Sequence, residues 1–208
     1  MQQYSTYLFD FDGTIVDSHD SLVKVFEDSY ASVGVKVPNG YVLRLMRIPL
    51  FQGYAELHAP EDEASKKRFG DMINQTLDAP EVLKLTKTYD DALKSLYALK
   101  ARGARLGIVT SNNVKHVREV LRFVNMPEDL FEVIIGNGDT KVHKPNPDPI
   151  YKALERLGID RDGVCYVGDA LQDFNTAINA KVEPILLDRH HEYDDVEGIK
   201  IYSLEELL

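Results

Sequence analysis

The stretch Tyr7-Leu8-Phe9-Asp10-Phe11-Asp12-Gly13-Thr14 decides the fold, because an apolar run ends abruptly in two carboxylates, a glycine and a hydroxyl. The apolar run indicates a buried strand, and Gly13 gives the backbone the freedom to turn away from it. An aspartate after a strand is also common in ordinary turns, where its side chain bonds nearby backbone. The pattern alone is therefore suggestive, and the rest of the chain must decide between a turn and a reactive site.

Three further segments place polar residues beside apolar runs, and they follow in a fixed order along the chain. One run ends in Thr110-Ser111-Asn112, Lys144 precedes the proline-started stretch 145–148, and a later run ends in Gly168-Asp169 with Asp173 four residues on. With these segments the chain resembles the haloacid dehalogenase superfamily, in the branch of phosphoglycolate phosphatases and β-phosphoglucomutases with an inserted helical cap. The resemblance covers nearly the whole chain and is least specific between the first and second motifs.

Composition narrows the class of protein. The chain has 208 residues, of which 44% are hydrophobic, so it can bury the core of one α/β domain and a small accessory domain. Apolar runs stay far below the roughly 20 residues of a membrane-spanning helix, and the N-terminus lacks a secretory pattern. The single cysteine, Cys165, excludes an internal disulfide and lies in a strand-like run. We expect a cytoplasmic protein with no membrane partner.

The charge balance bears on partners. Lysines and arginines number 24 against 34 aspartates and glutamates, and the resulting net charge of -10 disfavours nucleic acid as a partner. An acidic protein can still bind phosphate if it builds a local positive field from cations, a lysine and helix N-termini.

The order of elements predicts an α/β fold. Apolar runs predict strands at residues 7–11, 104–109, 131–135, 164–167 and 184–187, and amphipathic stretches predict helices at 90–101, 113–124 and 147–157. This alternation is typical of a doubly wound, Rossmann-like parallel sheet with helices on both faces. Ligands of such folds bind beyond the carboxyl ends of the strands, which is where the four motifs fall.

About seventy residues after the first strand contain no convincing strand. Ser18 is a candidate N-cap for a helix that ends before Gly34, a second helix is expected near Asn39, and a third after Pro60. We therefore predict an α/β core from residues 1–16 and 86–208, with a small all-helical cap domain, residues 17–85, inserted after the first strand.

The resemblance implies a role for each motif residue. Asp10 would be the nucleophile that forms an aspartyl-phosphate, and Asp12 the general acid that protonates the leaving group and then activates water. Lys144 would pair with the nucleophile and the phosphate, and Thr110 would bond a phosphoryl oxygen. Ser111 is a candidate phosphate contact, with helix capping as an equally reasonable role.

Charge counting adds a metal ion. Asp10, Asp12, Asp169 and Asp173 cannot gather around a nearly dianionic phosphate without cations, and Mg²⁺ suits oxygen ligands. By resemblance, its ligands would be the Asp10 carboxylate, the Asp12 backbone carbonyl and the Asp169 carboxylate, while Asp173 would orient metal-bound water or Lys144.

The function we predict is Mg²⁺-dependent hydrolysis of a small phosphorylated metabolite by a monomer or weak homodimer. A phosphomutase of the β-phosphoglucomutase type shares the aspartate pair and is the main alternative. A dehalogenase fits less well, since such relatives lack the second aspartate of the pair. A non-catalytic regulator on the same fold fits less well still, since none of Asp10, Asp12 and Asp169 is lost.

Two departures from the family pattern matter later. Tyr89-Asp90-Asp91 stands where relatives often have Pro-Gly-Val, and we expect these residues to be remote from the chemistry. Arg47 occupies a position where a cap glycine is common. It is either a solvated surface group or a residue that grips a second anionic group on the substrate.

Overall fold

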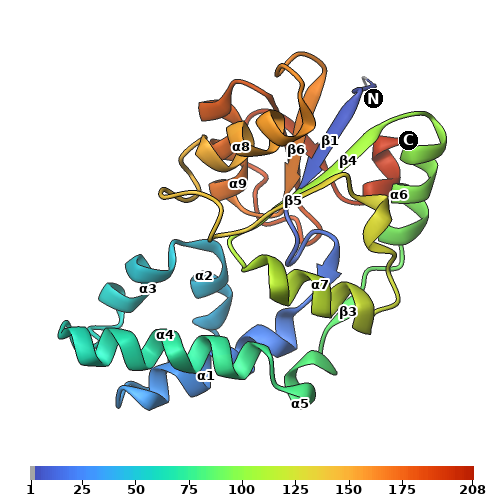
Figure 1. The fold of residues 1–208 in the computed structure, drawn as a ribbon. Coiled ribbons are helices and arrows are strands. Elements are labelled where there is room, and N and C mark those ends of the chain that lie inside the picture. The colour runs from blue at the N-terminus through green and yellow to red at the C-terminus, as the bar shows by residue number, and fades with distance from the viewer. Residues whose placement is uncertain (1–2) are drawn as a thin grey trace. The chain divides into compact units, whose positions relative to one another are not determined.

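The computed structural model of the protein describes residues 3–208, and these divide into two compact units. The sheet unit comprises the chain up to Asp17 together with Thr88–Leu208, and the helical unit is Ser18–Lys87. Figure 1 shows the ribbon, with the N-terminal strand in blue and the C-terminal segments in red. Each unit has its own core and is described separately below.

The sheet unit is built on one parallel sheet, which among the described residues has six strands. Their order is β5 (Val133–Ile135), β4 (Arg105–Val109), β1 (Thr6–Phe9), β6 (Val164–Gly168), β7 (Glu183–Leu187) and β8 (Ile199–Ile201). The register pairs Thr6 of β1 with both Arg105 and Val164, so β1 lies between β4 and β6. The prediction of a parallel α/β sheet is confirmed, and the carboxyl ends of these three strands share one edge.

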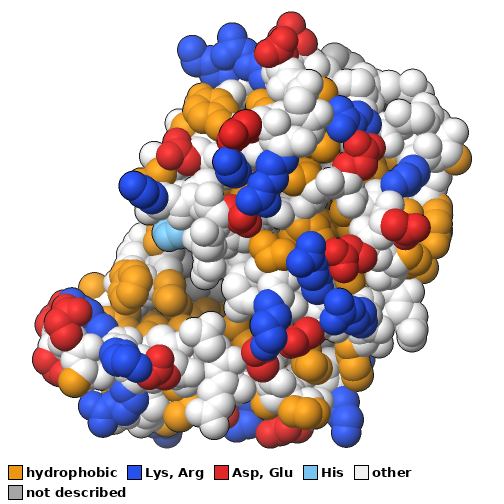
Figure 2. All heavy atoms as spheres, viewed as in Figure 1, with side chains coloured by type: hydrophobic (Ala, Val, Ile, Leu, Met, Phe, Trp, Pro, Cys, Tyr) orange, Lys and Arg blue, Asp and Glu red, His pale blue; other side chains and the backbone are white. Residues whose placement is uncertain are grey.

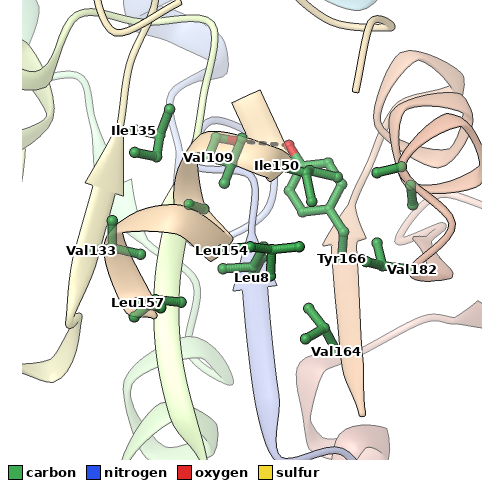
Figure 3. Close-up of a cluster of buried hydrophobic side chains, with 13 residues drawn as sticks. Leu8, Val109, Val133, Ile135, Ile150, Leu154, Leu157, Val164, Tyr166 and Val182 are labelled. Carbon is green, nitrogen blue, oxygen red and sulfur yellow. Dashed lines mark hydrogen bonds between the residues drawn. The ribbon is translucent and has the colours of Figure 1, made fainter. Parts of the chain in front are cut away.

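Helices cover the sheet on both sides. The chain between strands forms α6 (Ala92–Ala101), α7 (Val114–Phe123), α8 (Asp148–Leu157) and α9 (Leu171–Ala180), with short 3₁₀ turns at Glu128–Leu130 (η1) and Leu204–Leu207 (η2). In Figure 1, α8 and α9 lie on the opposite side of the sheet from α6. Figure 3 shows Ile150 and Leu154 of α8 packed over Leu8, Val109 and other aliphatic side chains of the sheet.

The helical unit is held by aromatic packing. It contains α1 (His19–Ser32), α2 (Val42–Arg47), α3 (Leu50–Glu56), α4 (Glu63–Leu77) and α5 (Pro80–Leu83), and α1 packs along α4. The ring centroid of Phe69 lies 4.8 Å from those of both Tyr30 and Tyr54, edge to face in each case. Such pairs add to the energy of burial alone, so this cluster is the centre of the unit.

The chain passes between the two units at β2 (Val16–Asp17) and β3 (Lys87–Thr88), which pair with each other as a two-stranded sheet.

The structure corrects several details of the sequence analysis. Ser18 precedes α1, but its side chain makes no capping bond among the described residues, because its ψ of 13° is not the extended conformation that aims the side-chain oxygen at the helix. The helix expected near Asn39 begins at Val42, after Gly40 adopts a φ of +74° that a helix does not allow. The three-residue strand β8 and the helix α3 were not predicted.

Side chains of both charges are interspersed over the face shown in Figure 2. In the part of the chain that the structure describes, no helix combines the length and the apolar character needed to cross a bilayer.

Candidate active site

A buried lysine is the centre of the candidate site. Lys144 lies in the segment between β5 and α8, and its side chain is 4% exposed. Its Nζ donates to Asp10 Oδ1 at 2.8 Å, to Asp173 Oδ1 at 2.5 Å and to the Tyr166 hydroxyl at 3.2 Å. Three acceptors for three ammonium protons satisfy this group completely, so its position is fixed.

The carboxylates reach Lys144 from two neighbouring strands. Asp10 follows β1 and donates its backbone N–H to Val167 of β6 at 2.8 Å, while Asp169 and Asp173 follow β6. Oxygens of these three aspartates lie within 4.8 Å of one another. Residues distant in sequence therefore meet at the shared carboxyl edge of the sheet, as the motif order predicts.

Two glycines make room for this crowding. A Cβ at Gly13 would lie 2.4 Å from an Asp169 carboxylate oxygen, and one at Gly168 would lie 2.3 Å from Asp173 Cβ. Gly13 also has a φ of +77°, which other residues rarely adopt. Both glycines are therefore part of the site's construction.

The electrostatics of the cluster favour an added cation. Burial, followed by the Asp173 carboxylate, raises the pKa of Asp169 to about 7 and holds the pKa of Asp10 well above its usual range. Burial alone would lower the pKa of Lys144, but Asp10 and Asp173 raise it above its ordinary value, so the ammonium stays charged. One buried ammonium does not balance these carboxylates.

A divalent cation fits this donor set. The cluster offers carboxylate oxygens, which are the ligands that hard cations such as Mg²⁺ prefer, and its remaining negative charge would stabilise the ion. The groups that could hold it are Asp10, Asp169 and Asp173, in addition to the predicted Asp12 carbonyl.

The remaining predicted residues of the sheet unit lie around this cluster. Asp12 is half-buried and accepts a hydrogen bond from Asn112 Nδ2 at 2.6 Å. Thr110 follows β4, is buried, and its hydroxyl accepts from the backbone N–H of Asn112 at 3.1 Å. Ser111 is exposed, and Gln172 approaches its hydroxyl only at 3.5 Å.

Arg47 belongs to the helical unit, where it is the last residue of α2 and is partly exposed. That Arg47 binds an anionic group of the substrate stays a prediction.

Sequence reasoning missed Tyr166, which contacts the centre of the site. This residue of β6 reaches past β1, and its hydroxyl lies 2.7 Å from the Val109 carbonyl, the bond dashed in Figure 3, and 3.1 Å from Asp173 Oδ1. Burial and the Asp173 carboxylate raise its pKa well above the ordinary value, so the phenol stays protonated. The available signal was a tyrosine in an otherwise aliphatic buried strand, because a buried hydroxyl needs a partner.

The structure also corrects the expectation that Asp91 is remote from the chemistry. Arg189, which follows β7, donates to both Asp91 oxygens at 2.8 and 3.0 Å and to the Thr14 carbonyl at 3.1 Å. The Thr14 hydroxyl in turn donates to Asp169 Oδ1 at 3.1 Å. Asp91 is therefore joined to the carboxylate cluster through an arginine and the turn of the first motif.

Fold and site together define a class: α/β enzymes that carry a lysine-bound carboxylate at the carboxyl edge of a parallel sheet. The family model described as haloacid dehalogenase-like hydrolase matches residues 7–187. The chain belongs to this family, as the motif residues predict.

Individual relatives agree with this assignment. The chain is 30% identical to a phosphoglycolate phosphatase of Rhodospirillum rubrum, over 92% of this chain and 83% of that protein. It is 29% identical to the pyrophosphatase PpaX of Bacillus pumilus, over 81% of this chain and 76% of that protein. Among solved structures, one described as a haloacid dehalogenase-like hydrolase from Bacteroides fragilis superposes with a TM-score of 0.88 at 28% identity, covering 99% of this chain and all of the other.

Proposed function

We propose that this protein is a Mg²⁺-dependent phosphatase that hydrolyses a small phosphate monoester through an aspartyl-phosphate on Asp10. The observation that carries the proposal is the buried contact between Lys144 and Asp10 at the carboxyl end of β1, beside Asp169 and Asp173. The phosphatase and pyrophosphatase named among the relatives support the same reaction type.

The chemistry follows from the placement of two carboxylates. Lys144 engages Asp10 Oδ1, which leaves Oδ2 as the oxygen that attacks phosphorus while the ester P–O bond breaks. Asp12 gives its proton to the departing oxygen, and its contact with Asn112 holds it in place. Asp12 then takes a proton from water, whose oxygen attacks phosphorus. The bond to Asp10 breaks, and inorganic phosphate leaves.

Other groups neutralise the charge of the transferring phosphoryl group. The Lys144 ammonium is fixed beside Asp10, and Thr110 supplies a hydroxyl at the end of the neighbouring strand. A Mg²⁺ ion held by Asp10, the Asp12 carbonyl and Asp169 would supply further positive charge to the phosphoryl oxygens, with Asp173 holding Lys144.

Substrate choice is assigned to the helical unit, which we propose acts as a cap. Arg47 is its candidate for a second anionic group on the substrate. Phosphoglycolate and pyrophosphate, named for the relatives, each carry such a group beside the phosphoryl group. Arg47→Ala should lower kcat/KM for such a substrate about tenfold to a hundredfold and leave an aryl phosphate unaffected. Arg44→Ala, in the same helix, is the matched control. Equal losses in both variants would mean that Arg47 is a solvated surface group and does not bind the substrate.

The test of the reaction is phosphate release from a panel of phosphorylated metabolites, with Mg²⁺ and with excess chelator. We expect release with Mg²⁺, none in chelator, and recovery when Mg²⁺ is restored. Full activity in chelator would contradict the metal-dependent mechanism. Sugar phosphates are assayed for isomers in parallel, because isomer formation that outpaces phosphate release would identify a phosphomutase.

A further inference from the structure

A mostly buried arginine outside the predicted motifs is tied to the carboxylate cluster. The side chain of Arg189 is 12% exposed, and that of its partner Asp91 is 11% exposed. The guanidinium forms two hydrogen bonds to the Asp91 carboxylate, a geometry that fixes orientation as well as distance. The guanidinium carbon Cζ also lies 3.9 Å from the ring centroid of Tyr89, so a cation–π contact further restrains the position of the guanidinium.

Asp91 is itself anchored on its other side. Its Oδ2 accepts from the Ser203 hydroxyl and from the Leu204 backbone N–H, each at 2.8 Å. The carboxylate thus connects the segment before α6, the start of η2 and the segment after β7. Arg189 therefore binds a carboxylate that Ser203 and Leu204 also hold in place.

The anchored guanidinium acts on the first motif through one contact. Arg189 Nη2 donates to the carbonyl of Thr14, which is completely buried. Thr14 uses its hydroxyl to hold Asp169 Oδ1 at 3.1 Å, and the lack of a side chain at Gly13 beside it lets that carboxylate lie directly against the turn. A shift of the Thr14 backbone would therefore turn the Asp169 carboxylate.

We infer that Arg189 is a positioning residue: by fixing the Thr14 backbone it sets the orientation of Asp169 for the divalent cation, without touching the phosphoryl group. This inference rests on the proposed function, in which Asp169 is a metal ligand. Partners that orient a metal ligand are typically worth ten- to a hundredfold in metal affinity. A purely structural arginine would change the stability of the protein and leave its metal affinity alone.

A matched control lies at the amino end of the strands of the same sheet, opposite the candidate site. Arg105, the first residue of β4, also bonds a carboxylate and a carbonyl: Glu132 at 2.8 Å and Leu157 at 3.1 Å. Arg105→Met removes an arginine with the same kinds of partner but no connection to Thr14.

The experiment measures Mn²⁺ binding to the metal-free protein by electron paramagnetic resonance, with Mg²⁺ as competitor. We expect Arg189→Met to weaken binding about tenfold and Arg105→Met less than twofold. Arg189→Lys, which keeps the charge but not the paired hydrogen bonds, should fall between wild type and Arg189→Met. It also serves as the measured variant if Arg189→Met does not fold.

A double-mutant cycle tests whether Arg189 acts on Asp169 through Thr14. Thr14→Val removes the hydroxyl that holds Asp169, so adding Arg189→Met to it should weaken binding little further, while Thr14→Ser should stay close to wild type. Equal affinities in the Arg189 and Arg105 variants, or additive effects with Thr14→Val, would overturn the inference while leaving the proposed function standing. A wild type that binds Mn²⁺ but hydrolyses no ester would overturn the proposed function, while the effect of Arg189 on Mn²⁺ affinity could still be measured and interpreted. A wild type that binds no Mn²⁺ would overturn both.

Discussion

The two units place their ionic groups in opposite environments. In the sheet unit, Lys144 and Asp173 form an ion pair in which neither side chain is more than 4% exposed. In the helical unit, Lys67 and Asp71 form a pair of similar chemistry on successive turns of α4, with side chains 76% and 64% exposed. The interior of the helical unit is instead filled by the rings of Tyr30, Tyr54 and Phe69.

The contrast between a buried ion pair and an aromatic core distinguishes side chains that stabilise a fold from side chains that serve a reaction. Removing charges from water costs several kcal/mol per ion, and packed apolar groups often stabilise a fold as well or better. The helical unit uses the less costly solution throughout its aromatic core. The sheet unit buries the ion pairs of Lys144 with Asp10 and Asp173 at the place where the proposed reaction needs them, so a buried ion pair is a better guide to function than an exposed one.

The largest expected effect comes from the buried carboxylate that we propose as nucleophile. Asp10→Asn keeps the shape of the side chain but removes the attacking oxygen, so turnover of an aryl phosphate should fall more than about a thousandfold. The measurement is phosphate release, with circular dichroism as the check on folding. Asp160→Asn, an exposed aspartate, is the control and should retain full activity. Residual turnover within tenfold of wild type would refute the covalent mechanism.

Breaking the buried ion pair should cost stability. Lys144→Met leaves Asp10 and Asp173 without their cation, and such a loss destabilises a protein by about 3–5 kcal/mol. The matched substitution Lys67→Met breaks an exposed pair and should cost less than about 1 kcal/mol. Urea denaturation of the metal-free variants gives both values. Similar values would remove the contrast between the units.

Aromatic packing should account for the stability of the helical unit. Phe69 is fully buried between two tyrosine rings, and truncation to alanine should cost about 3 kcal/mol, near the lower limit for this substitution because the rings can partly close the space. Hydrogen exchange of α1 and α4 locates the loss. Phe123→Ala, at an exposed phenylalanine of the sheet unit, should change stability far less.

The smallest effect concerns a surface network of the helical unit. Hydrogen bonds from Arg44 and then Tyr41 lower the pKa of Glu56 to about 2, from an ordinary value of 4.5. A carboxyl whose pKa falls on folding stabilises the protein above its unfolded pKa, and this contribution is lost as the pH falls. The difference in melting temperature between wild type and Glu56→Gln should therefore be present at pH 7 and disappear between about pH 4.5 and 2. A difference at pH 2 as large as that at pH 7 would contradict this assignment.

Much of the sheet unit was predictable because its signals are local. Each buried strand is a short apolar run, and Asp10, Thr110 and Asp169 stand immediately after such runs. In a parallel sheet, these positions meet at one edge whatever their separation along the chain. The family assignment followed from the same residues.

What could not be predicted depends on partners that are distant along the chain or on exact backbone angles. Tyr166 and Arg189 gain their roles from contacts with Lys144 and Thr14, and no spacing in the sequence indicates either contact. Ser18 has the residue type of an N-cap but not its backbone conformation. The metal ion, the substrate, the oligomeric state and cytoplasmic residence stay predictions.

The position of β1 in the sheet has a consequence for how the protein matures. β1 precedes the other strands of its sheet along the chain, yet it pairs with β4 and β6, where Arg105 and Val164 are the partners of Thr6. Contacts between residues so far apart in sequence form slowly, because the intervening chain must first lose much of its freedom. Asp10 is therefore synthesised long before Lys144 and β6, with which it forms contacts in the folded protein. A partly made chain that lacks Lys144 and β6 therefore carries Asp10 without the residues that surround it in the folded protein.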